Sequence, residues 1–126
     1  MTRYVDTNIL VRIMTNDVPE LTKEAIAQVE RSRPNELLIL DAVLVELFFV
    51  LEAGARYHFP RTRSALIFNG ILDTPQFKVS EMARAAFVLF TQHPKLDFMD
   101  CLLAAASNGQ EASLMTFDKD LLKILA

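Results

Sequence analysis

Short strand-like runs alternate with helix-like segments along the whole chain, and this alternation restricts the possible folds more than any other feature. The runs have the length of strands and lie at residues 3–6, 37–40, 77–80 and 113–117. The run 37–40 is apolar throughout, as expected of a parallel strand that is covered on both faces. Strands that alternate with helices predict an α/β fold, in which helices cover both faces of a parallel sheet.

Helices are expected between the apolar runs. Their apolar residues recur at helical spacing, and Pro, Gly, Asn or Asp stands near their ends. We expect these helices over about 17–33, 41–53, 60–72, 81–93, 96–108 and 118–125. A chain of 126 residues with three glycines and no low-complexity linker fits a single domain over residues 1–126.

Composition predicts a globular cytoplasmic protein without a membrane segment. The chain is 52% hydrophobic and 23% charged, which is typical of a folded soluble domain. Its single cysteine, Cys101, excludes an internal disulfide framework and agrees with a reducing compartment. The N-terminal residues lack a long apolar signal core. The most apolar stretch, residues 37–51, contains Asp41 and Glu46 and is too short to span a bilayer.

Isolated carboxylates lie inside or at the ends of the most apolar stretches. Asp6 ends the first run, Glu46 interrupts residues 43–51, Asp100 begins an apolar helix, and Asp118 follows the last run. A carboxylate that is buried alone costs several kcal/mol, so these positions require a partner. Few basic residues stand beside them in the sequence. A shared divalent cation is the simplest partner for all four.

The residue types favour a hard cation over zinc. Carboxylate oxygens suit Mg²⁺ or Mn²⁺, whereas His58 and His93 have no cysteines at zinc-site spacing. Asp6 and Asp118 fall at carboxyl ends of strands, where parallel sheets bind ligands. Mg²⁺ held by a few carboxylates keeps waters and accepts phosphate oxygens, which is the chemistry of phosphodiester hydrolysis.

Each acid also has an interpretation without a metal. Asp97, Asp118 and Asp120 stand near helix N-termini, where the helix dipole favours negative charge. Asp6 could instead cap the helix that follows it. Glu46 has the weakest alternative, because no basic residue stands near it within its apolar run.

The charge balance leaves RNA open as a partner. A net charge of −3 argues mildly against a nucleic acid, but the balance becomes +1 when the four acids are counted as a metal site. Arg56, Arg61 and Arg63 cluster in the sequence and could contact an RNA backbone. The same cluster could equally be a solvated helix end.

Four segments in this order resemble the motifs of PIN-domain ribonucleases, especially the VapC-type toxins of bacteria and archaea. The first is Tyr4-Val5-Asp6-Thr7-Asn8-Ile9-Leu10, and the second is Val45-Glu46-Leu47 within a helix. The third is Asp97-Phe98-Met99-Asp100-Cys101-Leu102-Leu103-Ala104-Ala105, and the fourth is Thr116-Phe117-Asp118-Lys119-Asp120-Leu121. No single motif is specific, but the likeness covers nearly the whole chain.

The resemblance implies a three-layer α/β/α sandwich around a central parallel sheet, and a Mg²⁺- or Mn²⁺-dependent endoribonuclease. Its catalytic, metal-binding acids would be Asp6, Glu46, Asp100 and Asp118, with Asp97 and Asp120 as accessory metal ligands. Thr7 and Asn8 match positions that support the first acid. Such toxins are usually homodimers and are held inactive by a small antitoxin protein, which often inserts a basic side chain into the acidic pocket.

One departure from the family and three rival functions stay open. The family's sheet normally gains a strand after the last short helix, whereas this sequence ends at Ala126, so we expect four or five strands.

The main rival is a PIN-like module with a degenerate site that binds RNA or protein. A phosphoaspartate protein is less compatible, because Thr7 and Asn8 follow Asp6. A structural partner protein is the third rival. Cys101 reads as a small core residue, because no histidine partner is spaced to activate it.

Overall fold

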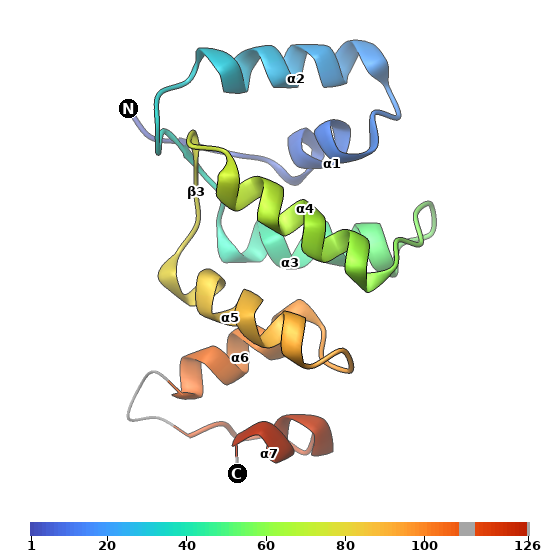
Figure 1. Cartoon of the computed structure of the whole chain (residues 1–126), viewed down its shortest axis with the longest axis vertical. Coiled ribbons are helices and arrows are strands. Elements are labelled where there is room, and N and C mark those ends of the chain that lie inside the picture. Colours follow the sequence, from blue (N-terminus) through green and yellow to red (C-terminus); the bar gives the residue numbers. More distant parts are fainter. Residues whose placement is uncertain (109–112, 126) are drawn as a thin grey trace. The chain divides into compact units, whose positions relative to one another are not determined.

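A computed structural model describes residues 1–108 and 113–125 of the chain, which belong to two units. The first unit is Met1–Val79 and the second is Ser80–Ala126. The first contains all the strands of the described residues together with four helices (Figure 1). The second contains three helices in its described part. The α/β class that the alternating pattern predicted is therefore confirmed.

A small parallel sheet organises the first unit. Its strands are β1 (Arg3–Tyr4), β2 (Leu37–Leu38) and β3 (Phe77–Lys78), hydrogen-bonded in the order β1-β2-β3. Arg3 pairs with Leu37, and Leu37 pairs with Phe77. Backbone hydrogen bonds continue the pairing by one residue, since the Val5 N–H donates to the Leu38 carbonyl at 3.0 Å. The sheet is parallel as predicted, and its strands are shorter than the apolar runs.

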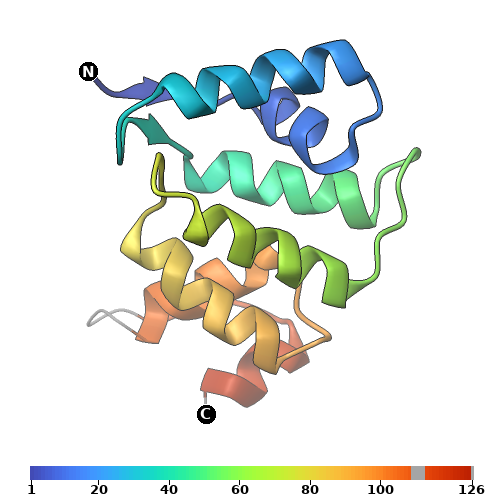
Figure 2. The same ribbon diagram turned by 45° about the horizontal axis from the view of Figure 1, so that its top comes forward.

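Four helices accompany this sheet. They are α1 (Thr7–Thr15), α2 (Pro19–Arg31), α3 (Asp41–Glu52) and α4 (Arg61–Asp73). Two views show α1 between α2 and α3, with α4 against α3 (Figure 2). Helix α1 begins at Thr7, with Val5 and Asp6 between it and β1, and its C-cap Asn16 has a left-handed φ of 51°. The expected helices did not include α1, which lies between the first strand-like run and the helix expected from about residue 17.

Helix α3 supplies much of the core of the first unit. Leu44, Leu47 and Leu51 are fully buried, and Phe48 stacks on Phe68 of α4 with ring centroids 5.6 Å apart. Burial of such side chains contributes about 1.5–3 kcal/mol each. None of the described helices, α3 included, combines the length and the apolar character that crossing a bilayer would require.

The described part of the second unit is helical. Its helices are α5 (Glu81–Gln92), α6 (Phe98–Asn108) and α7 (Lys119–Leu125), and α6 contacts both of the others. Ser80 begins α5 by accepting a hydrogen bond from the Ala83 N–H at 3.0 Å. Phe90 is buried and meets Phe98 of α6 edge to face, with ring centroids 5.9 Å apart. These contacts hold α5 and α6 together.

The strand predicted at 113–117 is not formed. Residues 113–118 carry no regular secondary structure, and the side chains of Met115 and Phe117 are 96% and 98% exposed. A strand needs backbone hydrogen bonds to a neighbouring strand, and those described for the chain include none from residues 113–117. The described residues therefore hold three strands, where four or five were predicted. The assignment of residues 1–126 to one domain stays a prediction.

Candidate acidic site

Asp6 stands where β1 gives way to α1. It occupies the N-cap position of α1 with extended backbone angles, φ −76° and ψ 147°, but its side chain makes no capping hydrogen bond. The side chain is exposed, and the backbone carbonyl of Asp6 accepts a hydrogen bond from the Ile9 N–H at 3.1 Å. Beside it, Thr7 is buried and Asn8 is exposed. Asp6 therefore holds the N-cap position that was considered for it, but its carboxylate makes no capping hydrogen bond and remains available to a ligand.

Glu46 corrects the expectation of a buried charge. Helix α3 turns Leu44, Leu47 and Phe48 toward the core, and Glu46 lies exposed on another face. Consecutive residues of a helix point in all directions around its axis, so one residue of an apolar run can face water while its neighbours face the core. Glu46 therefore needs no buried basic partner. Its helix packs against α1, which begins just after Asp6.

Asp97 and Asp100 form a reciprocal cap at the start of α6. The Asp100 N–H donates to Oδ1 of Asp97 at 2.8 Å, and the Asp97 N–H donates to Oδ2 of Asp100 at 3.4 Å. The Asp97 carbonyl accepts the first helical bond, from the Cys101 N–H at 3.1 Å. This arrangement is a capping box. The N-terminal interpretation of Asp97 is confirmed, and it accounts for part of the carboxylate surface of both residues.

Asp118 caps α7 with one carboxylate oxygen. Its Oδ1 accepts from the Asp120 N–H at 2.8 Å and from the Leu121 N–H at 3.1 Å. The Asp118 N–H donates to the Thr116 hydroxyl oxygen at 3.0 Å, which fixes the residue before the helix. Both of these hydrogen bonds to the side chain use Oδ1, so Oδ2 can serve a ligand. Asp120 follows half-buried in the first turn of α7.

Three carboxylates influence one another within the second unit. Partial burial raises the pKa of Asp100 above its ordinary value, and the negative charges of Asp97 and Asp118 raise it further. The raised pKa means that the local environment disfavours the ionised form. A cation among these oxygens would reverse the effect, because it favours ionised carboxylates. The donors are hard oxygens, and they fit Mg²⁺ or Mn²⁺.

The structure brings together some of the predicted acids. Asp97, Asp100 and Asp118 interact in the second unit, whereas Asp6 and Glu46 belong to the first. Among the described residues, no group of three or more histidine, cysteine or acidic side chains is arranged to hold a metal ion. The convergence of all four catalytic acids stays a prediction.

The predicted arginine cluster has local partners. Arg56 lies 3.6 Å from a carboxylate oxygen of Asp17 and 5.7 Å from the centre of the Tyr57 ring. The Arg63 guanidinium lies 3.8 Å from the centre of the Phe59 ring. Arg61 is half-buried and has an interaction partner of its own. Local contacts therefore account for these three side chains, and their role in RNA binding stays a prediction.

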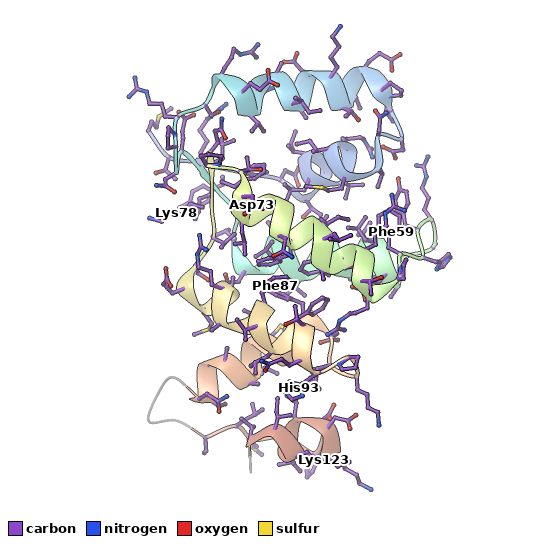
Figure 3. All side chains as sticks on the ribbon, in the orientation of Figure 1. Phe59, Asp73, Lys78, Phe87, His93 and Lys123 are labelled. Atoms are coloured by element: carbon purple, nitrogen blue, oxygen red, sulfur yellow. The ribbon has the colours of Figure 1, made fainter. Side chains whose placement is uncertain are left out.

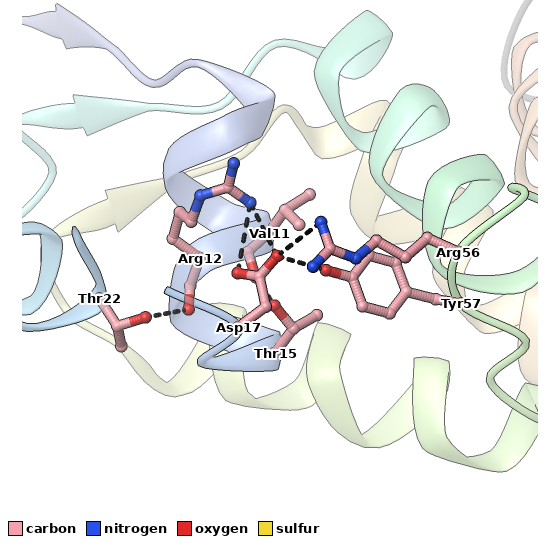
Figure 4. Close-up of polar contacts among 7 residues, drawn as sticks. All are labelled: Val11, Arg12, Thr15, Asp17, Thr22, Arg56 and Tyr57. Atoms are coloured by element: carbon pink, nitrogen blue, oxygen red, sulfur yellow. Dashed lines mark hydrogen bonds and ion pairs between the residues drawn. The ribbon is translucent and has the colours of Figure 1, made fainter. Parts of the chain in front are cut away.

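A polar cluster around Asp17 was not foreseen (Figure 4). We call Arg12, Asp17, Arg56 and Tyr57 the Asp17 cluster. The Tyr57 hydroxyl donates to Oδ2 of Asp17 at 2.6 Å, and Arg12 Nη1 lies 3.1 Å from the same oxygen. The hydrogen bond from Tyr57 lowers the pKa of Asp17, and the charges of Arg12 and Arg56 lower it further. The helix expected from about residue 17 begins as α2 at Pro19, with Val18 as its N-cap.

Comparison with protein families assigns the chain to a family. The model of the PIN domain matches residues 3–125. Searches of curated proteins and of solved structures gave no match. The matched range contains both units and all the acids described above. The chain belongs to the PIN-domain family, a nuclease superfamily whose members typically depend on Mg²⁺.

Proposed function

We propose that the chain is a Mg²⁺- or Mn²⁺-dependent endoribonuclease that hydrolyses RNA phosphodiester bonds. Membership of the PIN family supports a nuclease. Asp6, Glu46, Asp100 and Asp118 belong to the segments that resemble the family's motifs. The observation that carries most weight is the gathering of Asp97 and Asp118 around the partly buried Asp100, where burial and the two neighbouring charges raise the pKa of Asp100. Such an arrangement is unfavourable by itself, and a hard cation would stabilise it.

Each acid has a distinct role in this proposal. Asp6 and Glu46 offer exposed carboxylates, and Asp118 offers the oxygen that its cap leaves unused. Asp97 fixes the backbone of Asp100 through the capping box and so orients that carboxylate. Thr7 and Asn8 would support Asp6, with Asp120 as an accessory ligand. Bound Mg²⁺ or Mn²⁺ would activate water and offset the charge that grows on the phosphate.

Asp6→Asn gives the sharpest test. The Asp6 side chain caps nothing, so its replacement is expected to leave the melting temperature unchanged or raised. The variant is expected to lose Mn²⁺-stimulated cleavage of total cellular RNA. Glu30→Gln is the matched control, because Glu30 is exposed on α2 and lies outside the proposed site. Full activity of the Asp6 variant would refute the assignment.

We also propose that the chain is the toxin of a VapBC-type toxin–antitoxin pair, acting in the cytoplasm as a homodimer. Similarity of the four motifs to VapC-type toxins supports this identity. Cys101 is buried and is the single cysteine of the sequence, which is compatible with a reducing compartment. Light scattering would give the oligomeric state. Co-expression with the protein encoded by a short upstream reading frame should suppress growth inhibition if the pair exists, and growth unaffected by the chain alone would contradict the toxin role.

One observation favours a second candidate, a PIN-like module without catalytic activity that binds RNA or protein. Asp97 and Asp118 act as helix caps, and capping explains these acids without a metal. Calorimetric titration with Mn²⁺ separates the two candidates. Binding that Asp6→Asn weakens supports the nuclease, whereas no heat of binding to the wild-type chain supports the module.

A further inference from the structure

A cavity in the second unit is lined by two exposed lysines. It has a volume of about 290 Å³ and is lined by His93 and Lys95 from the turn after α5, and by Asp120 and Lys123 from α7. Figure 3 labels His93 and Lys123 on these two elements. Leu96 also lines the cavity, and its side chain is 1% exposed. We call this space the Lys95–Lys123 cavity.

Rigid backbone supports the cavity on both sides. The His93 N–H donates to the Leu89 carbonyl at 2.9 Å, and the Leu96 N–H donates to the His93 carbonyl at 3.0 Å. These bonds close the turn that carries Lys95. On the other side, α7 is anchored by Leu121, which is 2% exposed. The two lysines are themselves exposed, so their ammonium groups are open to a ligand from solvent.

The lysines of the cavity are not neutralised by neighbours. Neither Lys95 nor Lys123 forms an ion pair with another residue of the described ranges 1–108 and 113–125, and Asp120 is beyond ion-pair distance of Lys123. By contrast, Arg12 in the first unit has an acidic partner at 3.1 Å. Two ammonium groups therefore face one carboxylate in the cavity. The local charge is positive in a chain whose net charge is −3.

We infer that the Lys95–Lys123 cavity binds a backbone phosphate of the RNA, beside the phosphate that is cleaved. This inference rests on the proposed function for the identity of the polymer. Asp120 connects the cavity with the proposed metal site, because it lines the cavity and its N–H donates to Oδ1 of Asp118 at 2.8 Å. An acidic site repels a polyanion, and adjacent unpaired lysines offset that repulsion. The mixture of lysine and apolar surface also suits a phosphate with its sugar.

A purely structural role predicts different behaviour. Lys123 stands in the last turn of α7, and His93 is the C-cap of α5, where positive charge stabilises the helix dipole. If that were the whole role, loss of either lysine would lower the melting temperature and leave RNA affinity unchanged. Binding and melting must therefore be measured on the same variants.

The test uses the full chain with Asp6→Asn, so that RNA is bound without being cut. Fluorescence anisotropy follows a labelled single-stranded RNA of about 12 nucleotides, a length that spans several phosphate contacts. Lys95→Gln and Lys123→Gln are each expected to raise the Kd by about threefold or more, and to reduce the slope of log Kd against log salt by about 0.7. Lys119→Gln is the matched control, because Lys119 is an exposed lysine of α7 outside the cavity.

Three results would overturn the inference. They are an unchanged Kd and salt slope in both cavity variants, an equal loss of affinity in Lys119→Gln, or binding of inorganic phosphate by the cavity while RNA affinity does not depend on either lysine. Cleavage by the chain with its native Asp6 gives the separate readout. Absence of Mn²⁺-dependent cleavage with lysine-dependent binding would refute only the nuclease, whereas cleavage whose KM ignores both lysines would refute only the cavity.

Discussion

Asp118 has two roles in our account, and two substitutions can separate them. Its Oδ1 caps α7 by accepting hydrogen bonds from Asp120 and Leu121, and its other oxygen is proposed to bind a metal ion. Asp118→Ala removes both functions. Asp118→Asn keeps a carbonyl oxygen that can accept the same two bonds, but it removes the negative charge. The two variants should therefore differ in stability and agree in activity.

The expected sizes follow from the hydrogen bonds. Loss of an N-cap to alanine costs about 1 kcal/mol, within a range of about 0.5–2 kcal/mol. For a chain of 126 residues, an unfolding entropy of about 2.1 cal/mol/K per residue converts this loss to a melting temperature about 4 °C lower. Asparagine caps helices about as well as aspartate. The asparagine variant also loses a repulsion with Asp100, which offsets its weaker interaction with the helix dipole.

Scanning calorimetry in metal-free buffer measures the stability difference, and an RNA cleavage assay with Mn²⁺ measures activity. We expect Asp118→Asn to melt close to the wild type, Asp118→Ala to melt lower, and both to lose cleavage. An asparagine variant that cleaves at the wild-type rate would show that Asp118 is only a cap. An alanine variant with an unchanged melting temperature would show that the cap contributes nothing measurable.

Three further predictions concern stability. Burial and neighbouring charge raise the pKa of Asp100 in the folded chain, so ionisation of Asp100 opposes folding once the pH exceeds the ordinary pKa of an aspartate. Asp100→Asn should therefore melt at a higher temperature than the wild type at neutral pH without metal. A gain in melting temperature that persists at a pH well below 3.8 would contradict this cause. Gly70→Ala should raise the free energy of unfolding by about 0.5–1 kcal/mol, because the added Cβ would meet open space in α4. Gly54→Ala should lower the free energy of unfolding, because the added Cβ would lie 2.6 Å from the Val50 carbonyl oxygen. Thermal melts that reverse this order would refute the reasoning. Ser64→Ala should be neutral or stabilising in urea unfolding, because the buried Ser64 hydroxyl finds no hydrogen-bond partner among the described residues, and a clear loss of stability would reveal a partner.

Local sequence signals predicted the parts of the fold that depend on local chemistry. Helices α3, α4, α5 and α6 begin and end within about three residues of the expected limits, because proline, glycine and capping residues act on their own neighbours. The parallel pairing of the strands followed from the alternation of elements. Asp97 and Asp118 were placed near helix N-termini on the same grounds, and both cap the helices that follow them.

Features that depend on distant neighbours were missed or mistaken. The exposure of Glu46 depends on which faces of α3 are covered, and a uniformly apolar helix does not reveal that. The apolar run at 113–117 has strand composition, but a strand requires a partner, which composition does not supply. Asp17 and Tyr57 stand 40 residues apart, and no sequence spacing indicates their hydrogen bond.

The Asp17 cluster has a consequence for the two helices that present Asp6 and Glu46. Arg12 belongs to α1, Tyr57 follows α3, and the Phe59 N–H returns to the Leu51 carbonyl of α3 at 2.8 Å. The far end of α1 is thereby fastened to the far end of α3. Rotation of either helix about its axis would strain the hydrogen bonds of the Asp17 cluster. Substitution of Tyr57 would therefore change the relative orientation of Asp6 and Glu46, although Tyr57 contacts neither of them.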